Sequence, residues 1–198
     1  MLRRHGFAIF VFLLRQLPPA VWTVQAVTSC VQLTSCFAST ETLHHEAVWL
    51  LFGAPRLWIF TSLEVQLEVY DVLRAVIERK PRAFLLPPSS TDEPLLSVQA
   101  LLDLLEIYYW HQPSAASFAR QPLHHAVSGE VIGERPGVEG LRKLRAKVLG
   151  LLQVLAEAEL SRADAQCLIA VLRSCRDARV LIDVLKLLMG WLAPLGPS

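Results

Sequence analysis

The sequence predicts an all-α fold in which about eight helices stack into a solenoid, with one long flexible loop. Hydrophobic residues make up 53 % of the 198 residues, and only 9 residues are glycine. Because leucine carries much of the apolar content and glycine destabilises helix interiors, this balance favours helix over strand. Apolar residues also recur at helical spacing in nearly every segment outside the loop. We find no convincing strand pattern.

Ordinary start and stop residues bound each expected helix. The expected helices are residues 7–16, 19–37, 43–52, 61–80, 95–110, 138–160, 161–174 and 177–192.

Prolines and glycines separate the first four helices. Pro19 opens the second helix, and Gly53 ends the third because glycine readily adopts the conformation that ends a helix. Thr61 and Glu64 have the spacing of a capping box, in which a hydroxyl and a carboxylate bond to free amides at the helix start. Pro81 ends that fourth helix.

The helix from Leu95 to Trp110 is the expected centre of the core. Pro94 suits its first turn. Apolar residues cover most of its circumference, and a helix that is apolar nearly all round is buried on several sides. We therefore expect Leu101 and Leu105 to be buried.

Two further cap patterns divide the C-terminal part of the chain. Ser161 and Asp164 have cap spacing, and Asp177 starts the last helix. The expected apolar face of that last helix is Val180, Leu181, Val184, Leu185, Leu188 and Leu192.

The chain divides into three parts. Residues 1–111 are expected to form armadillo-like helical repeats, residues 112–137 a flexible loop, and residues 138–198 a continuation of the solenoid. Proline, glycine and serine interrupt all periodicity in the loop. No exact internal repeat is present, but armadillo-type and HEAT-type repeats are degenerate. A closed helical bundle is the alternative arrangement.

Charge and cysteine content exclude several classes of protein. The net charge is +1, from 19 basic and 18 acidic residues, so no global field attracts nucleic acid. Four cysteines are too few for a disulfide-stapled mini-domain of this length, which favours reduced thiols.

Residues 1–26 resemble a targeting segment in part. A basic start precedes the apolar run from Phe7 to Leu14, but Arg15 interrupts it and no clear cleavage site follows. The run is too short to span a bilayer, which needs about 20 apolar residues. A buried helix is the preferred interpretation, and a signal or anchor is the alternative.

No catalytic or metal-binding pattern joins the reactive side chains. The candidate thiols and bases are Cys30, Cys36, Cys167, Cys175, His5, His44, His45, His111, His124 and His125. None lies in a catalytic signature, and the cysteine spacings do not match those of common zinc sites. No glycine-rich loop could hold a phosphate. We therefore predict no catalytic residue, no cofactor and no metal site.

Two clusters invite a binding interpretation. Arg142, Lys143, Arg145 and Lys147 form the one dense basic cluster, which more often is a solvated helix face than a site for lipid or RNA. The run Tyr108 to Trp110 could line a groove, but its place at the end of a core helix favours packing.

Three segments resemble a known family. They are Leu57 to Leu67, Leu95 to Trp110, and the Leu-rich helices from Leu141 through Cys167 to Leu188. Together they resemble the helical, armadillo-like region upstream of the BEACH domain in neurobeachin-type proteins. These motifs are Leu-rich helices of low specificity. The BEACH domain, the PH-like domain and the WD repeats of that family are absent from this sequence.

The resemblance implies a non-enzymatic scaffold fragment that binds protein partners in vesicle trafficking and granule biogenesis. It implies a cytoplasmic location, with peripheral association with endoplasmic reticulum, Golgi or granule membranes. It carries over no catalytic or ligand-binding residue, and it implies no nucleic acid and no small-molecule substrate. The alternative is a signal-anchored or secreted all-helical protein.

Overall fold

The computed structural model describes residues 6–14, 16–53, 57–59, 61–79, 97–109, 123–124, 131–133, 136–158, 162–174 and 178–192. These residues contain eight α-helices and a 3₁₀ turn, η2 (Pro19–Val21). The helices are α1 (Gly6–Leu14), α2 (Val24–Ser35), α3 (Glu41–Phe52), α4 (Leu63–Arg79), α5 (Val98–Tyr109), α7 (Val138–Ala158), α8 (Arg162–Ser174) and α9 (Ala178–Leu192).

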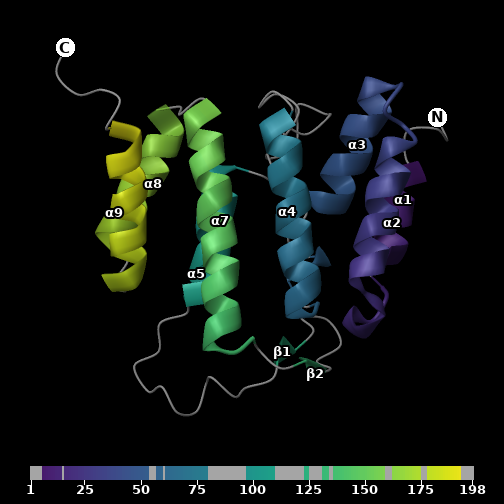
Figure 1. Cartoon of the computed structure of the whole chain (residues 1–198), viewed down its shortest axis with the longest axis horizontal. Coiled ribbons are helices and arrows are strands. Elements are labelled where there is room, and N and C mark those ends of the chain that lie inside the picture. The colour runs from purple at the N-terminus through teal and green to yellow at the C-terminus, as the bar shows by residue number, and fades with distance from the viewer. Residues whose placement is uncertain are drawn as a thin grey trace.

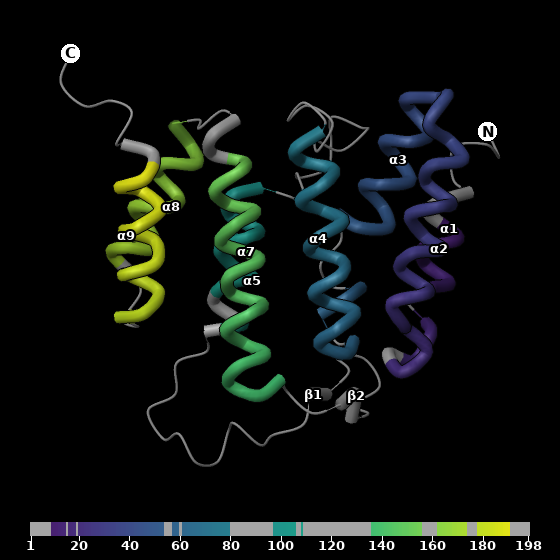
Figure 2. Tube along the Cα trace, viewed as in Figure 1, coloured from purple at the N-terminus to yellow at the C-terminus, as the bar shows by residue number. Residues whose placement is uncertain are grey.

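The helices stack in two rows along the long axis of the molecule (Figure 1). One row contains α2, α4, α7 and α9, and the row behind it contains α1, α3, α5 and α8. Helices α1 and α9 lie at opposite ends of the stack (Figure 2). The arrangement is therefore an open solenoid, as the sequence predicted, and not a closed bundle.

The densest part of the core lies where α5 and α4 pack against α7. Leu101 and Leu105 of α5 are buried, which confirms the prediction for this helix. Helix α7 contributes a fully buried row, Leu144, Val148, Leu151 and Leu152. Its spacing of three and four residues places one apolar face of α7 against both neighbours.

Helix α7 packs tightly against α4 near its own start. A Cβ added at Gly140 would lie 2.8 Å from Cδ2 of Leu63. Glycine at this position therefore permits the two longest helices of the stack to meet without displacing the leucine.

Two helix starts differ from the sequence prediction. Helix α2 begins at Val24, not at Pro19, because the Thr23 hydroxyl accepts a hydrogen bond from the amide of Ala26 at 3.2 Å. At the start of α4, the Ser62 hydroxyl, not that of Thr61, accepts from the amide of Val65 at 3.4 Å. Thr61 instead donates its hydroxyl to the Trp58 carbonyl at 2.6 Å, so the predicted capping box is wrong.

An aromatic cluster packs the segment between η2 and α2 against the connection between α3 and α4. The rings of Trp22 and Trp58 meet edge to face at 4.8 Å, and Phe52 stacks beside Trp58 at 6.0 Å. The Trp58 indole donates to the Leu51 carbonyl at 2.7 Å, so its polar atom is satisfied inside the core.

One short strand pair lies within the all-α fold. Strands β1 (Leu123–His124) and β2 (Val131–Gly133) pair antiparallel within the segment expected to be a loop. Valine and isoleucine at positions 131 and 132 favour extended backbone, and two or three residues are too few to show a strand pattern in the sequence. The other residues predicted as flexible loop lie outside the described residues, apart from Pro136 and Gly137 beside α7.

The terminal helices leave part of their apolar surface exposed. In α9, Val180 and Val184 are buried, but Leu185 from the expected apolar face is exposed. In α1, Val11 is buried while its apolar neighbours are exposed. Ser161, Cys175 and Asp177, which carried the remaining C-terminal predictions, lie outside the described residues.

Candidate interaction surfaces

A buried polar chain links α4 to α5. The Tyr70 and Tyr108 hydroxyls are hydrogen-bonded to each other, and Tyr108 donates to Oε1 of Gln66 at 3.0 Å. The Gln66 amide donates to the Thr61 carbonyl at 2.8 Å. Burial raises the pKa of Tyr108 to about 12 and holds the pKa of Tyr70 well above its usual value. Both phenols stay protonated at neutral pH, and their hydrogen bonds pair polar atoms that are buried between α4 and α5.

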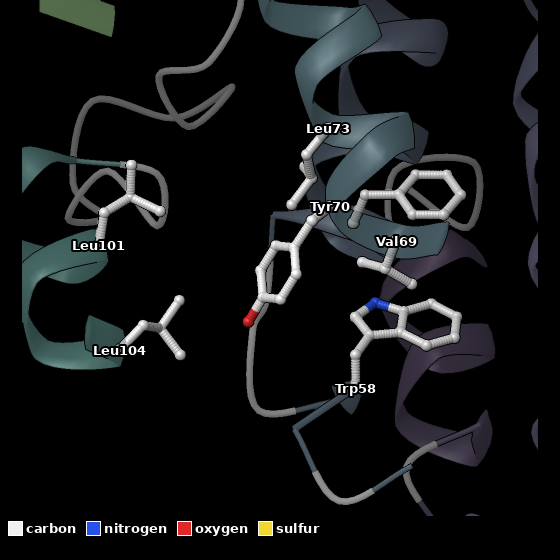
Figure 3. Close-up of a pocket in the computed structure, with 7 residues that line it drawn as sticks. Trp58, Val69, Tyr70, Leu73, Leu101 and Leu104 are labelled. Atoms are coloured by element: carbon white, nitrogen blue, oxygen red, sulfur yellow. The ribbon is translucent and has the colours of Figure 1, made fainter. Parts of the chain in front are cut away.

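The cavity beside this chain is small and apolar. It is lined by Phe52, Trp58, Val69, Tyr70, Leu73, Leu101 and Leu104. Figure 3 shows the Tyr70 ring between α4 and the two leucines of α5. Its volume of about 10 Å³ is close to the minimum that holds one water molecule, so it is a packing defect and not a ligand site.

The candidate thiols and histidines that the structure describes are held by helix packing. Cys30 is buried in α2, and burial raises the pKa of its thiol. Nδ1 of His44 lies 2.9 Å from the Thr34 carbonyl oxygen, which joins α3 to α2. Among the described residues, no group of three His, Cys, Asp or Glu side chains could hold a metal ion.

The remaining candidate cysteines and histidines lie at separate places or outside the described residues. Cys36 is exposed at the end of α2, Cys167 is half-buried in α8, and His45 lies in α3. His5, His111, His125 and Cys175 lie outside the described residues, and for His124 only the backbone is described.

The basic cluster of α7 lies on a solvent face and is partly neutralised. Arg142 pairs with Glu139 at 3.2 Å, and both side chains are well exposed. Lys147 pairs with Asp71 across the α4–α7 seam. Arg145 donates from Nε to the Leu141 carbonyl at 3.2 Å. The cluster is therefore accessible on the helix surface, and carboxylates of α4 and α7 pair part of its charge.

The neighbouring helix α4 carries both acidic and basic side chains. Arg74 and Glu78 form an exposed pair at 2.7 Å, one turn apart. Glu64 is exposed and Glu68 half-exposed on the same helix. The exposed and half-exposed charged residues of α4 and α7 form one surface, which we call the charged face. They are Glu64, Glu68, Asp71, Arg74, Glu78, Glu139, Arg142, Lys143, Arg145 and Lys147.

The aromatic run at the end of α5 does not form a described groove. Tyr108 is buried in the hydrogen-bonded chain, as the packing interpretation predicted. The side chain of Tyr109 and all of Trp110 lie outside the described part of the structure.

Sequence reasoning missed the long-range polar contacts. Gln66 and Tyr70 carried no motif, because their partner Tyr108 is about 40 residues further along the chain. The Asp71–Lys147 pair joins residues 76 apart. A tyrosine on the apolar face of each helix was the one available signal, and it did not identify the partner.

The two-row stack of antiparallel helices defines the molecule as an α-solenoid, a class that works through extended surfaces. The family model for the Neurobeachin/BDCP, DUF4704 alpha solenoid region matches residues 1–195. The chain belongs to this family, as its resemblance to neurobeachin-type proteins predicted.

A curated relative agrees with this assignment. The chain is 25 % identical to BEACH domain-containing protein B of Arabidopsis thaliana. The aligned segment has 187 residues and covers 93 % of the chain. The match spans 7 % of the relative's length. No solved structure matches the chain significantly. Along the described helices, none combines the length and apolarity that crossing a bilayer requires.

Proposed function

We propose that this chain is a non-enzymatic protein-interaction scaffold in intracellular membrane traffic and granule biogenesis. The observation that carries the proposal is the open two-row solenoid, shared with a family whose name includes neurobeachin. A solenoid presents long surfaces on rigid helices, which suits it to hold several protein partners. The proposed location is the cytoplasm, with peripheral association with endoplasmic reticulum, Golgi or granule membranes.

The charged face of α4 and α7 is the proposed partner-binding surface. Lys143 is exposed beside the Arg142–Glu139 pair, and Asp71 and Lys147 bridge the seam between the two helices. Charges of both signs on a rigid face set partner choice and orientation more than affinity. A partner with complementary charge would therefore recognise this face with a defined register.

A charge-reversal experiment tests the proposal. The full chain is expressed in cells, its neighbours are cross-linked and quantified, and arrival of a secretory reporter is timed. Arg142→Glu combined with Lys143→Glu should remove a defined set of partners and delay the reporter, because both side chains are exposed on the charged face.

Lys186→Glu on α9 is the matched control, because it reverses an exposed positive charge outside the charged face. The proposal fails if the double variant, with its helical content unchanged, keeps both partners and reporter timing. Extraction of membranes at alkaline pH checks the location. A peripheral scaffold is released, whereas retention in the membrane would favour the signal-anchored alternative.

A further inference from the structure

Helices α4 and α7 lie side by side and run in the same direction. Near their starts, a Cβ added at Gly140 of α7 would lie 2.8 Å from Cδ2 of Leu63 in α4. Two turns further on, Lys147 pairs with Asp71. The helices therefore keep in step over these turns, and their charged residues lie on parallel rows with the same repeat.

The two helices differ in the sign of the charges on these rows. The first three charged residues of α4 are all acidic, namely Glu64, Glu68 and Asp71. In α7, four basic residues follow Glu139 within two turns, namely Arg142, Lys143, Arg145 and Lys147. We call the first set the acidic row and the second set the basic row. The first half of the charged face therefore has an acidic row beside a basic row.

Some of this charge has no partner within the described chain. Asp71 and Lys147 pair across the seam between the two helices. No ion pair between described residues includes Glu64, Glu68 or Lys143. Glu64 and Lys143 are exposed and Glu68 is half-exposed, so all three side chains are accessible to charges on a partner.

The surface of α7 beside the basic row is shallow. Ala146, which is exposed between Lys143 and Lys147, has a side chain of one carbon atom. One turn later, a Cβ added at Gly150 would meet only the Arg74 guanidinium among the described residues, at 3.8 Å. The backbone of a partner can therefore come close to α7 here while its charged side chains reach both rows.

The pattern of signs fits a protein helix better than a polyanion. A bilayer or a nucleic acid presents one sign of charge over a wide area, so the acidic row of α4 would repel it. Glu64 and Glu68 are four residues apart, as are Lys143 and Lys147, and this is the spacing of neighbouring charges on a helix face. A partner helix has the same rise per residue, so its charges can stay in step with both rows.

We propose that the acidic row of α4 and the basic row of α7 together bind a helix of a partner protein. The bound helix carries a row of basic side chains that faces α4 and an adjacent row of acidic side chains that faces α7. The inference rests on the proposed function, because it names the partner chemistry that the charged face recognises.

Designed helical peptides test the proposal on the full chain. The row peptide carries a row of Lys beside a row of Glu in an alanine background. The mixed peptide has the same composition, but Lys and Glu alternate within each row, and the same hydrocarbon staple holds both peptides helical. Fluorescence anisotropy at low ionic strength should show about tenfold or tighter binding of the row peptide, and the difference should shrink at about 0.5 M salt, because exposed charges are screened.

Charge reversal on α7 should change which peptide is preferred. Arg142→Glu combined with Lys143→Glu should weaken binding of the row peptide about tenfold or more, and should favour a peptide with two Lys rows, because both helices then present acidic rows. Both side chains are exposed, so circular dichroism should stay unchanged. Lys186→Glu on α9 is the matched control, and it should alter neither preference.

Three results would overturn the proposal. They are equal binding of the row and mixed peptides, row-peptide binding that survives the charge reversal on α7, and a preference for the row peptide that Lys186→Glu removes as effectively. A fourth is tighter binding of phosphatidylserine vesicles than of the row peptide, lost on charge reversal, since a lipid surface would then be the occupant.

The partner chemistry and the scaffold proposal fail separately. If charge reversal on α7 changes the cross-linked partner set while the row peptide has no advantage over the mixed peptide, the partner chemistry alone is overturned. If the row peptide binds as expected while the partner set and reporter timing do not respond to charge reversal, the scaffold proposal alone is overturned.

Discussion

Truncation of Leu101 tests the placement of the core. Leu101 is 1 % exposed on α5 and lies beside the small cavity formed with Tyr70 and Trp58. Changing it to alanine removes three carbon atoms from the core, which costs about 2.4 kcal/mol of transfer free energy. The new space joins the existing cavity, and incomplete collapse raises the expected loss of unfolding free energy to about 4 kcal/mol.

Leu185→Ala is the matched control, because the same atoms are removed from a leucine that is 47 % exposed on α9. We expect a loss below about 1 kcal/mol there, as for most surface substitutions. Urea unfolding followed by circular dichroism measures both variants, and tryptophan fluorescence checks whether the transition is two-state. Helical stacks can unfold in parts, and coincident curves would justify a single free energy.

The result that would refute the reasoning is a similar loss for Leu101→Ala and Leu185→Ala. A loss below about 0.5 kcal/mol for Leu101→Ala would show that α5 is peripheral to the core. A lower slope with urea for Leu101→Ala alone would instead show that the variant unfolds through a populated intermediate.

Three further predictions concern single contacts. Tyr108→Phe should lower the unfolding free energy by about 1–3 kcal/mol, because it leaves the buried Gln66 oxygen without its donor. Burial raises the pKa of Tyr108 to about 12, so the stability that its protonated hydroxyl contributes is complete below the ordinary pKa near 10 and is lost as the pH rises towards 12. Between about pH 10 and 12, the unfolding free energy of Tyr108→Phe should therefore fall less with pH than that of the wild type. Thr23→Ala should cost about 1 kcal/mol by thermal unfolding, through loss of the cap on α2, and Thr23→Ser should restore it. Gly190→Ala should stabilise α9 by up to about 1 kcal/mol, because the space around Gly190 is open. Gly140→Ala should show no such gain, because its Cβ would meet a side chain of α4. Equal gains in the two variants would contradict the close packing of α7 against α4 at Gly140.

The helices could be predicted from the sequence because the residues that bound them act locally. Helix α3 ends at Gly53 as expected, although Gly53 keeps a right-handed φ of −73°. The periodic leucines of α5 and α7 are buried, as their spacing indicates. The capping residue of α4 could not be predicted in the same way. Thr61 and Ser62 both have a suitable hydroxyl, and the choice depends on the turn that brings the Trp58 carbonyl to Thr61. Such a choice between neighbours is decided by tertiary contacts.

The candidate surfaces were less predictable, because periodicity shows that a helix has an apolar side but not whether a neighbour covers it. In α9, Val184 and Leu185 are adjacent in an apolar stretch, yet the first is buried and the second is exposed. In α1, Val11 is buried between two exposed phenylalanines. The covering helices decide these outcomes, and their identity depends on the order of packing in the stack.

The distribution of charge adds what periodicity lacks. Charged side chains are mostly exposed in folded proteins, and those of α4 and of the first half of α7 lie at exposed or half-exposed positions. The exposed rows of α1 and α2 carry no charged residue, although both helices occupy an end of the stack where one side has no neighbouring helix among the described residues. An apolar side chain that is exposed singly needs no explanation. The exposed apolar residues of α1 and α2 are therefore distinguished from those charged rows by composition, a difference that periodicity alone does not show.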